Sequence, residues 1–498
     1  MLKKIASNTI SQILSKVFTA IISIFLISAL TKYLSPEMYG QYNKIYNYLA
    51  IFTFLADLGL YTISVREISK DRENAHKIVG NVMSLRFILA IAIIFLSVLI
   101  ALFLPGYNSN ITLISIFIIS IFSVFSLMNS SVLSLMQAFM KIEFSGVTFV
   151  IGKIVNLSII LFIIYFIYPK NTTTSFDNSF ILIMISGLIG IIVNYYMNYF
   201  YAKKIVEIKF LFDIDYMKHL FKISLPYGVA LFLSIVYFKV DVVIISLLEP
   251  QVKADLSIAF YSLPMKIIEV LMVIGVFFLN SILPSLSELF KENNLEKITI
   301  LLKNSFRFLF SFSLIIVVLG ILFGKDIISI IATKDYLDST IHNYTSYDAM
   351  IVVLFVLLFY FISSLFNYIF IASKNEKTIL HINIIITIVN IVGNILLIPK
   401  FSFIGSALTT LFSQILLFGL SYYFSRKIIK FDFDFFYLLK AIIFSIFMFL
   451  LGNYFLLNYN LGHIGNILIY GTIFFIIFIG YFLLLNKSII SGQLKLKN

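Results

Sequence analysis

Charged side chains interrupt the long apolar segments of this chain at only a few positions. The cationic positions are Lys16, Arg86, Lys153, Lys239 and Lys266. The anionic positions are Asp57, Asp241 and Glu269. A charge buried in an apolar segment is costly, and it usually serves binding or transport. Because cations outnumber anions, the set favours an anionic ligand and argues against a pump for cationic drugs, which would need surplus carboxylates.

Helical periodicity indicates that two of these lysines face a polar cavity. The first apolar segment carries one polar stripe, at Asn8, Gln12, Lys16, Thr19 and Ser23. The eighth segment carries another, at Ser262, Lys266, Glu269 and Asn280. Residues three or four apart share a helical face, so the first stripe is continuous, and the four residues of the eighth segment also share one face. We therefore predict that Lys16 and Lys266 line a cavity. For Lys16 the alternative is a side chain that reaches the headgroups or packs between helices; for Lys266 it is a pair with Glu269.

Two further cationic residues share their helical faces with fewer polar residues. Lys153 shares a helical face with Gly146 and Asn156, which is a weaker stripe. Arg86 either reaches toward the headgroups or pairs with Asp57. Asp57 itself belongs to a polar face of the second segment, together with Asn43, Tyr46, Thr53 and Ser64.

The segment near mid-chain contains both Lys239 and Asp241, which point to nearly opposite sides of a straight helix. Pro226 makes a local bend plausible, so Lys239 stays a candidate for the cavity. In contrast, Lys44 and Lys440 lie at segment ends, where a lysine can extend to the headgroups.

Neutral polar stripes mark two later segments. The eleventh has Asn383, Thr387, Asn390 and Asn394 on one face, and the twelfth has Ser406, Thr410 and Ser413. Such stripes either form hydrogen bonds between helices or line a hydrophilic path for sugars or a small cation.

The composition indicates a membrane protein built from many helices. Of its 498 residues 60% are hydrophobic and 12% are charged, which is too few charges for the surface of a soluble protein. Apolar runs of about twenty residues predict an all-α polytopic fold. We expect fourteen spans, at residues 9–30, 43–63, 80–104, 111–137, 145–168, 178–201, 222–248, 257–283, 304–324, 349–372, 378–399, 402–424, 435–457 and 463–486. The absence of Cys excludes disulfides and thiol chemistry, and no soluble-enzyme motif occurs.

The distribution of basic residues predicts the orientation. Loops on the side of both termini contain 24 Lys and Arg residues, and those on the opposite side contain 6. Because positive loops stay in the cytoplasm, we expect both termini to be cytoplasmic. The same bias accounts for most of the net charge of +13, so we expect no nucleic-acid partner.

A faint internal repeat divides the predicted spans. The first span is followed by a short loop and Tyr39-Gly-Gln-Tyr42. The seventh span is followed in the same way by a short loop and Ala259-Phe-Tyr261. This pattern predicts two six-helix lobes related by a pseudo-two-fold axis, at residues 1–210 and 211–430. Residues 431–498 would add two helices and a cytoplasmic tail.

Several stretches resemble the polysaccharide-biosynthesis flippases of the MATE-like (MOP) superfamily, the Wzx-type exporters of O-antigen and capsule units. They are residues 30–42, Asp57-Leu-Gly-Leu60, Arg66-Glu67, Ser224-Leu-Pro226, Lys239-Val-Asp241, Ala259-Phe-Tyr261, Leu283-Pro-Ser-Leu286, Asn390-Ile-Val-Gly-Asn394, Ile398-Pro399 and Gly405-Ser-Ala407. They keep the family's order over the first twelve spans.

The resemblance implies a transporter of the bacterial inner membrane. It would move an undecaprenyl-pyrophosphate-linked oligosaccharide from the inner to the outer leaflet by alternating access, alongside polysaccharide polymerase or assembly proteins. The pyrophosphate would then be the anion that the five deep cations neutralise. Other members of the superfamily leave two alternatives, a cation-coupled exporter of small molecules and a lipid II flippase. A membrane polymerase or glycosyltransferase is disfavoured, because the largest outer loop, 325–348, is short.

The resemblance also suggests how transport is driven. In some relatives a sodium ion lies among spans 7, 11 and 12, and Asp241, Asn390, Asn394 and Thr410 match that arrangement. The eleventh span here offers Asn in place of a second carboxylate. Coupling to sodium or to protons therefore stays open, and no other cofactor is expected.

Overall fold

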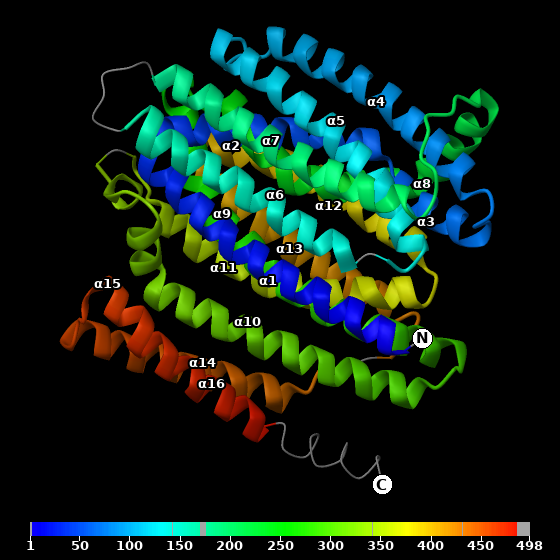
Figure 1. Cartoon of the computed structure of the whole chain (residues 1–498). Coiled ribbons are helices and arrows are strands. Elements are labelled where there is room, and N and C mark those ends of the chain that lie inside the picture. Colours follow the sequence, from blue (N-terminus) through cyan, green and yellow to red (C-terminus); the bar gives the residue numbers. More distant parts are fainter. Residues whose placement is uncertain (1, 142, 170–175, 341, 431, 486–498) are drawn as a thin grey trace. The chain divides into compact units, whose positions relative to one another are not determined.

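The computed structural model describes residues 2–141, 143–169, 176–340, 342–430 and 432–485 (Figure 1). Within this part every regular element is helical, and fourteen helices are long and apolar enough to cross a membrane. Each of them overlaps one of the predicted spans. The prediction of an all-α polytopic fold is confirmed, and the chain is a multi-pass membrane protein.

The chain forms two compact units, Met1–Ala259 and Phe260–Asn498. The first contains α1 (Leu2–Tyr33), α2 (Pro36–Asp57), α3 (Leu60–Lys70), α4 (Ala75–Phe103), α5 (Asn110–Ala138), α6 (Glu143–Phe162), the π-helix η1 (Ile163–Ile167), α7 (Phe176–Lys203), α8 (Ile214–Leu248) and the start of α9 (Gln251–Lys291). The second contains the rest of α9, α10 (Leu295–Ile331), the 3₁₀-helix η2 (Lys334–Leu337), α11 (Ser346–Ala372), α12 (Glu376–Phe401), α13 (Phe403–Ser425), α14 (Phe435–Asn458), α15 (Gly462–Gly465), the π-helix η3 (Asn466–Gly471) and α16 (Thr472–Leu485). The lobe boundaries near residues 210 and 430 stay predictions.

Side-chain caps fix where several helices begin. Ser35 accepts a hydrogen bond from the Met38 N–H, and Pro36 occupies the first turn of α2, where its missing N–H costs nothing. Asp213 caps α8 through the Tyr216 N–H in the same way. These caps explain why α8 begins before the predicted span: the cap lies several residues outside the apolar run.

The second predicted span, 43–63, is interrupted between α2 and α3. Leu58 and Gly59 have φ angles of 38° and 73°, which end one helix and start another. The backbone of α8 approaches this break closely, since a Cβ added at Gly228 would lie 2.1 Å from the Leu58 carbonyl oxygen. Glycine at position 228 therefore allows the contact between α8 and the break.

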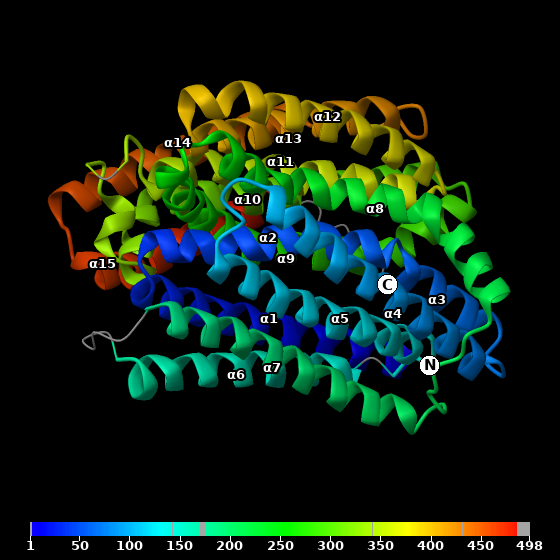
Figure 2. The same cartoon turned by 90° about the horizontal axis from the view of Figure 1, so that it is seen from above.

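Two glycines bring α6 and α7 into backbone contact. A Cβ at Gly152 would lie 2.7 Å from the Gly190 carbonyl oxygen, and one at Gly190 would lie 2.8 Å from the Gly152 carbonyl oxygen. Figure 2 shows the two helices side by side. Lipid gives helices no hydrophobic reason to associate, so close approach at small residues is a main source of their packing energy.

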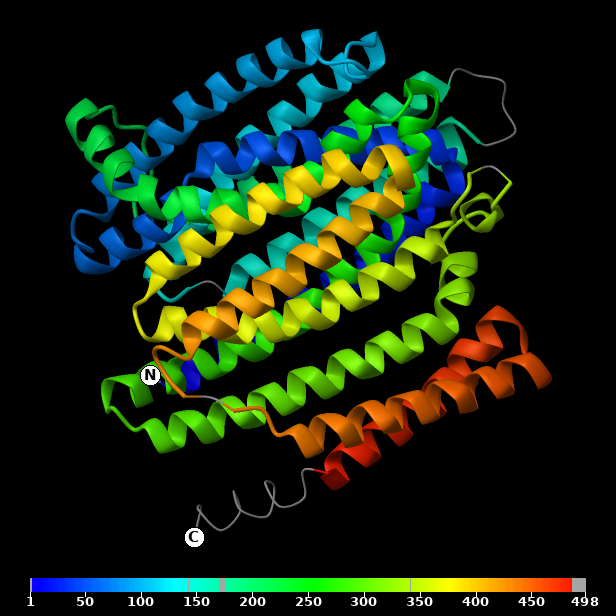
Figure 3. The ribbon, with the colours of Figure 1, turned by 180° about the vertical axis from the view of Figure 1, so that it is seen from behind.

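The core of the second unit is α11, which packs against α10 and α13. Its buried face includes Phe361, Phe366 and Phe370, all fully inaccessible. The helix α12 packs against α13, and the C-terminal helices α14 and α16 contact α10 (Figure 3).

One expectation about a basic residue is wrong. Lys44 does not extend to the headgroups: it is 3% exposed, and its Nζ lies 2.6 Å from Asp255 Oδ1. The same ammonium donates to the Gly106 carbonyl at 2.9 Å and lies 5.4 Å from the centre of the Tyr107 ring. Asp255, near the start of α9 and far from Lys44 in the sequence, contacts α2 there and neutralises the ammonium charge of Lys44 inside the protein. Lys440, in contrast, is exposed.

This pair predicts a specific loss of stability. Lys44→Met should lower the free energy of unfolding by roughly 1–3 kcal/mol, because it leaves the Asp255 carboxylate without its partner. Thermal melting of the purified protein measures the change. Lys440→Met is the matched control and should melt like the wild type. Additional replacement of Asp255 by Leu should restore part of the loss; a Lys44→Met protein of unchanged stability would contradict the role of the pair.

Fourteen spans and the asymmetry of basic residues together predict the topology. Reporter fusions after Lys3, at residue 210 and after Lys487 should all report a cytoplasmic location, because positively charged loops resist translocation. A fusion within residues 325–348 should report the opposite side. An external location for residue 210 would overturn this orientation.

Candidate functional site

The first unit contains a polar cavity of about 340 Å³ beside Lys16, which we call the Lys16 cavity. Its polar wall includes Lys16 and Thr19 of α1, Asn129 and Gln137 of α5, and Asn194 and Asn198 of α7. Its apolar wall includes Leu133 and Phe149. None of the described residues that line it is acidic, so the Lys16 ammonium is the one formal charge on its wall. The side chains of Asn8 and Gln12, which belong to the predicted stripe, lie outside the described part.

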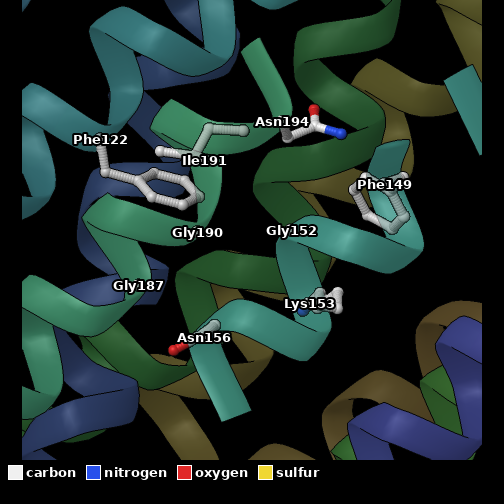
Figure 4. Close-up of a pocket in the computed structure, with 9 residues that line it drawn as sticks. All are labelled: Phe122, Phe149, Gly152, Lys153, Asn156, Gly187, Gly190, Ile191 and Asn194. Atoms are coloured by element: carbon white, nitrogen blue, oxygen red, sulfur yellow. The ribbon is translucent and has the colours of Figure 1, made fainter. Parts of the chain in front are cut away.

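A smaller cavity of about 140 Å³ contains Lys153, the second predicted cation. Figure 4 shows Lys153 and Asn156 on α6, with Ile191 and Asn194 on α7. Phe149 and Asn194 line both this cavity and the Lys16 cavity, so the two adjoin. Lys16 and Lys153 therefore line neighbouring cavities of the first unit.

Four side chains between α5, α6 and α7 form a closed circuit of hydrogen bonds, which we call the amide ring. Asn129 donates to the Asn194 oxygen at 2.7 Å, and Asn194 donates to the Thr148 hydroxyl at 3.3 Å. Thr148 donates to the Asn198 oxygen at 2.7 Å, and Asn198 donates back to the Asn129 oxygen at 2.9 Å. All four are buried. Each bond joins two helices, so the ring fixes three helices at the edge of the Lys16 cavity.

The amide ring was not predicted from the sequence. Asn194 and Asn198 are four residues apart, so they share one face of the sixth span, and this spacing was an available signal. Nothing in the sequence, however, indicates that Asn129 and Thr148 of two other helices complete the circuit.

Arg86 pairs with Asp57, which is one of the two arrangements predicted for it. It is fully buried, its Nη2 lies 2.5 Å from Asp57 Oδ1, and its Nη1 donates to Ser131 at 2.8 Å. The charge of Arg86 is thus compensated by Asp57 at the end of α2. The arrangement links α2, α4 and α5, which is a structural role.

Lys266 pairs with Glu269 on α9 at 3.3 Å, and each side chain is 33% exposed. The structure therefore shows the alternative in which Lys266 pairs with Glu269 on the same helix. Since the pair is neutral as a whole, Lys266 offers a ligand less positive potential than an unpaired lysine would.

Lys239 and Asp241 differ in their burial. Lys239 is half-buried, whereas Asp241 is fully buried. Neither lines the two cavities described above. Their roles stay predictions.

The predicted polar stripes of α12 and α13 meet in the second unit. The Asn394 amide donates to the Asn390 side-chain oxygen at 3.1 Å and accepts a hydrogen bond from Ser406. Thr410 lies 3.5 Å from the Tyr261 hydroxyl. Among the described residues no cluster of three or more His, Cys, Asp or Glu suits a metal ion. Asn390, Asn394 and Thr410 would offer amide and hydroxyl oxygens to a sodium ion, and this site stays a prediction.

Two family models match the chain. Residues 5–290 match the family described as polysaccharide biosynthesis protein, and residues 226–396 match the MatE family. The first match covers more than half of the chain.

A similar curated protein is the capsular polysaccharide biosynthesis protein CapF of Staphylococcus aureus. It is 25% identical over 423 residues, which cover 81% of this chain and 97% of that protein.

Solved structures share the fold. The lipid II flippase MurJ in its inward closed conformation has a TM-score of 0.76 at 20% identity, covering 97% of this chain and 100% of that one. An inward-facing multidrug resistance MATE transporter of the MOP superfamily has a TM-score of 0.66 at 12% identity, covering 84% and 98%. The chain thus shares its fold with these proteins, and the family match leads to one conclusion: it belongs to the polysaccharide biosynthesis protein family.

Proposed function

We propose that this protein is a flippase for an undecaprenyl-pyrophosphate-linked oligosaccharide, a repeat unit of a surface polysaccharide. It would carry this lipid from the inner to the outer leaflet of the bacterial cytoplasmic membrane by alternating access. The family and the similarity to CapF support the polysaccharide class. The observation that carries the proposal is the Lys16 cavity. The Lys16 side chain gives its wall a positive charge, and none of the described residues that line it is acidic.

A pyrophosphate that enters a cavity of low dielectric loses its hydration, and fixed positive charge must replace it. Lys16 and Lys153 suit this role, because they line adjoining cavities. Lys266 is a weaker candidate since Glu269 already pairs with it. Arg86 is the weakest of the predicted ligands, because its charge is engaged by Asp57 within the helix packing. Lys239 remains a candidate.

A second function, cation-coupled export of small molecules, is favoured by one observation, the match of residues 226–396 to the MatE family. Lys16 distinguishes the two proposals. A cationic drug would be repelled by the Lys16 cavity, whereas a pyrophosphate would be attracted. Measurement of dye efflux alongside polysaccharide export separates them.

We also propose that transport is coupled to a sodium or proton gradient through Asp241, with Asn390, Asn394 and Thr410 as further ligands if the ion is sodium. The buried carboxylate of Asp241 supports this role, because a charged group at such depth usually takes part in transport. Partners that consume the flipped product, such as a polysaccharide polymerase, would act on the outer side.

The role of Lys16 predicts the outcome of its substitution. Lys16→Ala should reduce export of surface polysaccharide by about 10- to 100-fold, since it removes a charge-assisted interaction with the pyrophosphate. Lys16→Arg should retain more activity because the charge persists. Export is measured together with the abundance of the protein in the membrane, and Lys440→Ala serves as the control for loss of an exposed lysine.

Arg86→Ala provides the contrast. It should reduce abundance and export together, because its primary effect is to leave Asp57 unpaired. Normal export by an abundant Lys16→Ala/Lys153→Ala protein would refute binding of the pyrophosphate in these cavities.

The proposed coupling predicts that Asp241→Asn abolishes gradient-driven transport while the protein stays inserted and abundant. Asparagine keeps the size of the side chain but removes its charge and its titration, so packing should change little. Uptake of labelled lipid-linked oligosaccharide into vesicles, with sodium and proton gradients imposed separately, measures the effect. Transport that continues at the wild-type rate after both gradients are collapsed would exclude coupling.

A further inference from the structure

The amide ring has hydrogen-bonding capacity beyond its own circuit. An asparagine amide carries two N–H donors and an oxygen with two lone pairs. The ring uses one donor and one lone pair of Asn129, Asn194 and Asn198. Each of these amides therefore has one further N–H and one further lone pair. All three line the Lys16 cavity, whereas Thr148, the fourth member of the ring, does not.

These groups are held rigidly. Asn129, Thr148, Asn194 and Asn198 are 6%, 0%, 2% and 1% exposed, and they come from three packed helices. Because each amide is oriented by its two neighbours in the ring, its remaining donor and acceptor point in fixed directions. A ligand then binds without the entropic cost of ordering these side chains.

The chemistry of this wall is that of a neutral surface with alternating donors and acceptors. A hydroxyl group both donates and accepts, so a molecule with hydroxyls on adjacent carbons matches such a surface. Leu133 and Phe149 add an apolar wall to the same cavity, against which the C–H face of a sugar ring can pack. A lipid tail cannot satisfy the amides, and a cationic dye would meet Lys16.

We propose that Asn129, Asn194 and Asn198 bind the hydroxyl groups of the sugar that is attached to the pyrophosphate. This inference rests on the proposed function and identifies which part of the substrate the first unit recognises. Lys16, which would bind the pyrophosphate, and the three amides line one cavity. The hydroxyl groups that the amides bind would therefore belong to the sugar directly attached to the pyrophosphate. The volume of about 340 Å³ is at the small end for ligand pockets, which suits one sugar better than a whole repeat unit.

Two probes separate recognition of the sugar from recognition of the pyrophosphate. Full-length protein in lipid nanodiscs is titrated with undecaprenyl pyrophosphate, and separately with the lipid-linked oligosaccharides extracted from cells that make this protein. The wild type should bind the oligosaccharide form at least about tenfold more tightly, which corresponds to one or two hydrogen bonds.

Variants of the ring test its part in this preference. Asn129→Leu should lose the preference yet bind undecaprenyl pyrophosphate like the wild type, because Lys16 is unchanged. Thr148→Val is the comparison variant: it leaves the three cavity amides in place but removes one ring neighbour of Asn194 and of Asn198. It should therefore melt at a lower temperature and lose less of the preference than Asn129→Leu does. Should Asn129→Leu fail to fold, Asn129→Ser keeps a hydroxyl near the ring, withdraws the amide from the cavity, and should reduce the preference.

The possible results have different meanings. Equal binding of both probes by the wild type would overturn recognition of the sugar and leave the proposed function standing. An equal loss of preference in Asn129→Leu and Thr148→Val would assign the effect to helix packing and also overturn it. Failure of the wild type to bind either probe would overturn the proposed function itself.

Discussion

The low dielectric of the membrane interior is the constraint on which the rest of this structure depends. A charge there must be paired, hydrogen-bonded, or placed in a cavity that water or a ligand can enter. Arg86 is paired with Asp57, and Lys44 with Asp255, so these charges are used to join helices. Lys16 instead lines a polar cavity whose described wall contains no carboxylate. The same physical rule thus separates cations that hold the fold together from a cation that can serve a ligand.

Close packing of helix backbones makes the polar site possible. Gly152 and Gly190 allow α6 and α7 to touch, and this brings Thr148 of one helix beside Asn194 of the other. Amides inside a membrane protein need partners, because lipid supplies none. The amide ring meets part of that need within the protein, and its three asparagines also line the cavity. Glycine packing and polar recognition are therefore two consequences of one helix contact.

The fold alone does not define what is transported. The same arrangement of helices occurs in a lipid II flippase and in multidrug transporters, at 20% and 12% identity. Substrate class must therefore be argued from the chemistry of the cavity walls. Here those walls combine one ammonium, several amides and an apolar patch, which suits an anionic sugar lipid better than a cation.

The sequence by itself determined the membrane class, the fourteen spans and the family motifs, because these depend on the length of apolar runs and on residues that are close in the chain. It also predicted that Lys16 lines a cavity, because the polar stripe of this lysine repeats with the period of a helix. Tertiary structure alone decided which charges are compensated. Lys44 was expected at the headgroups and Arg86 had two interpretations, whereas the structure pairs them with Asp255 and Asp57. The amide ring likewise depends on three helices meeting. Pairing of this kind is a property of distance between helices, which the periodicity of any single helix does not encode.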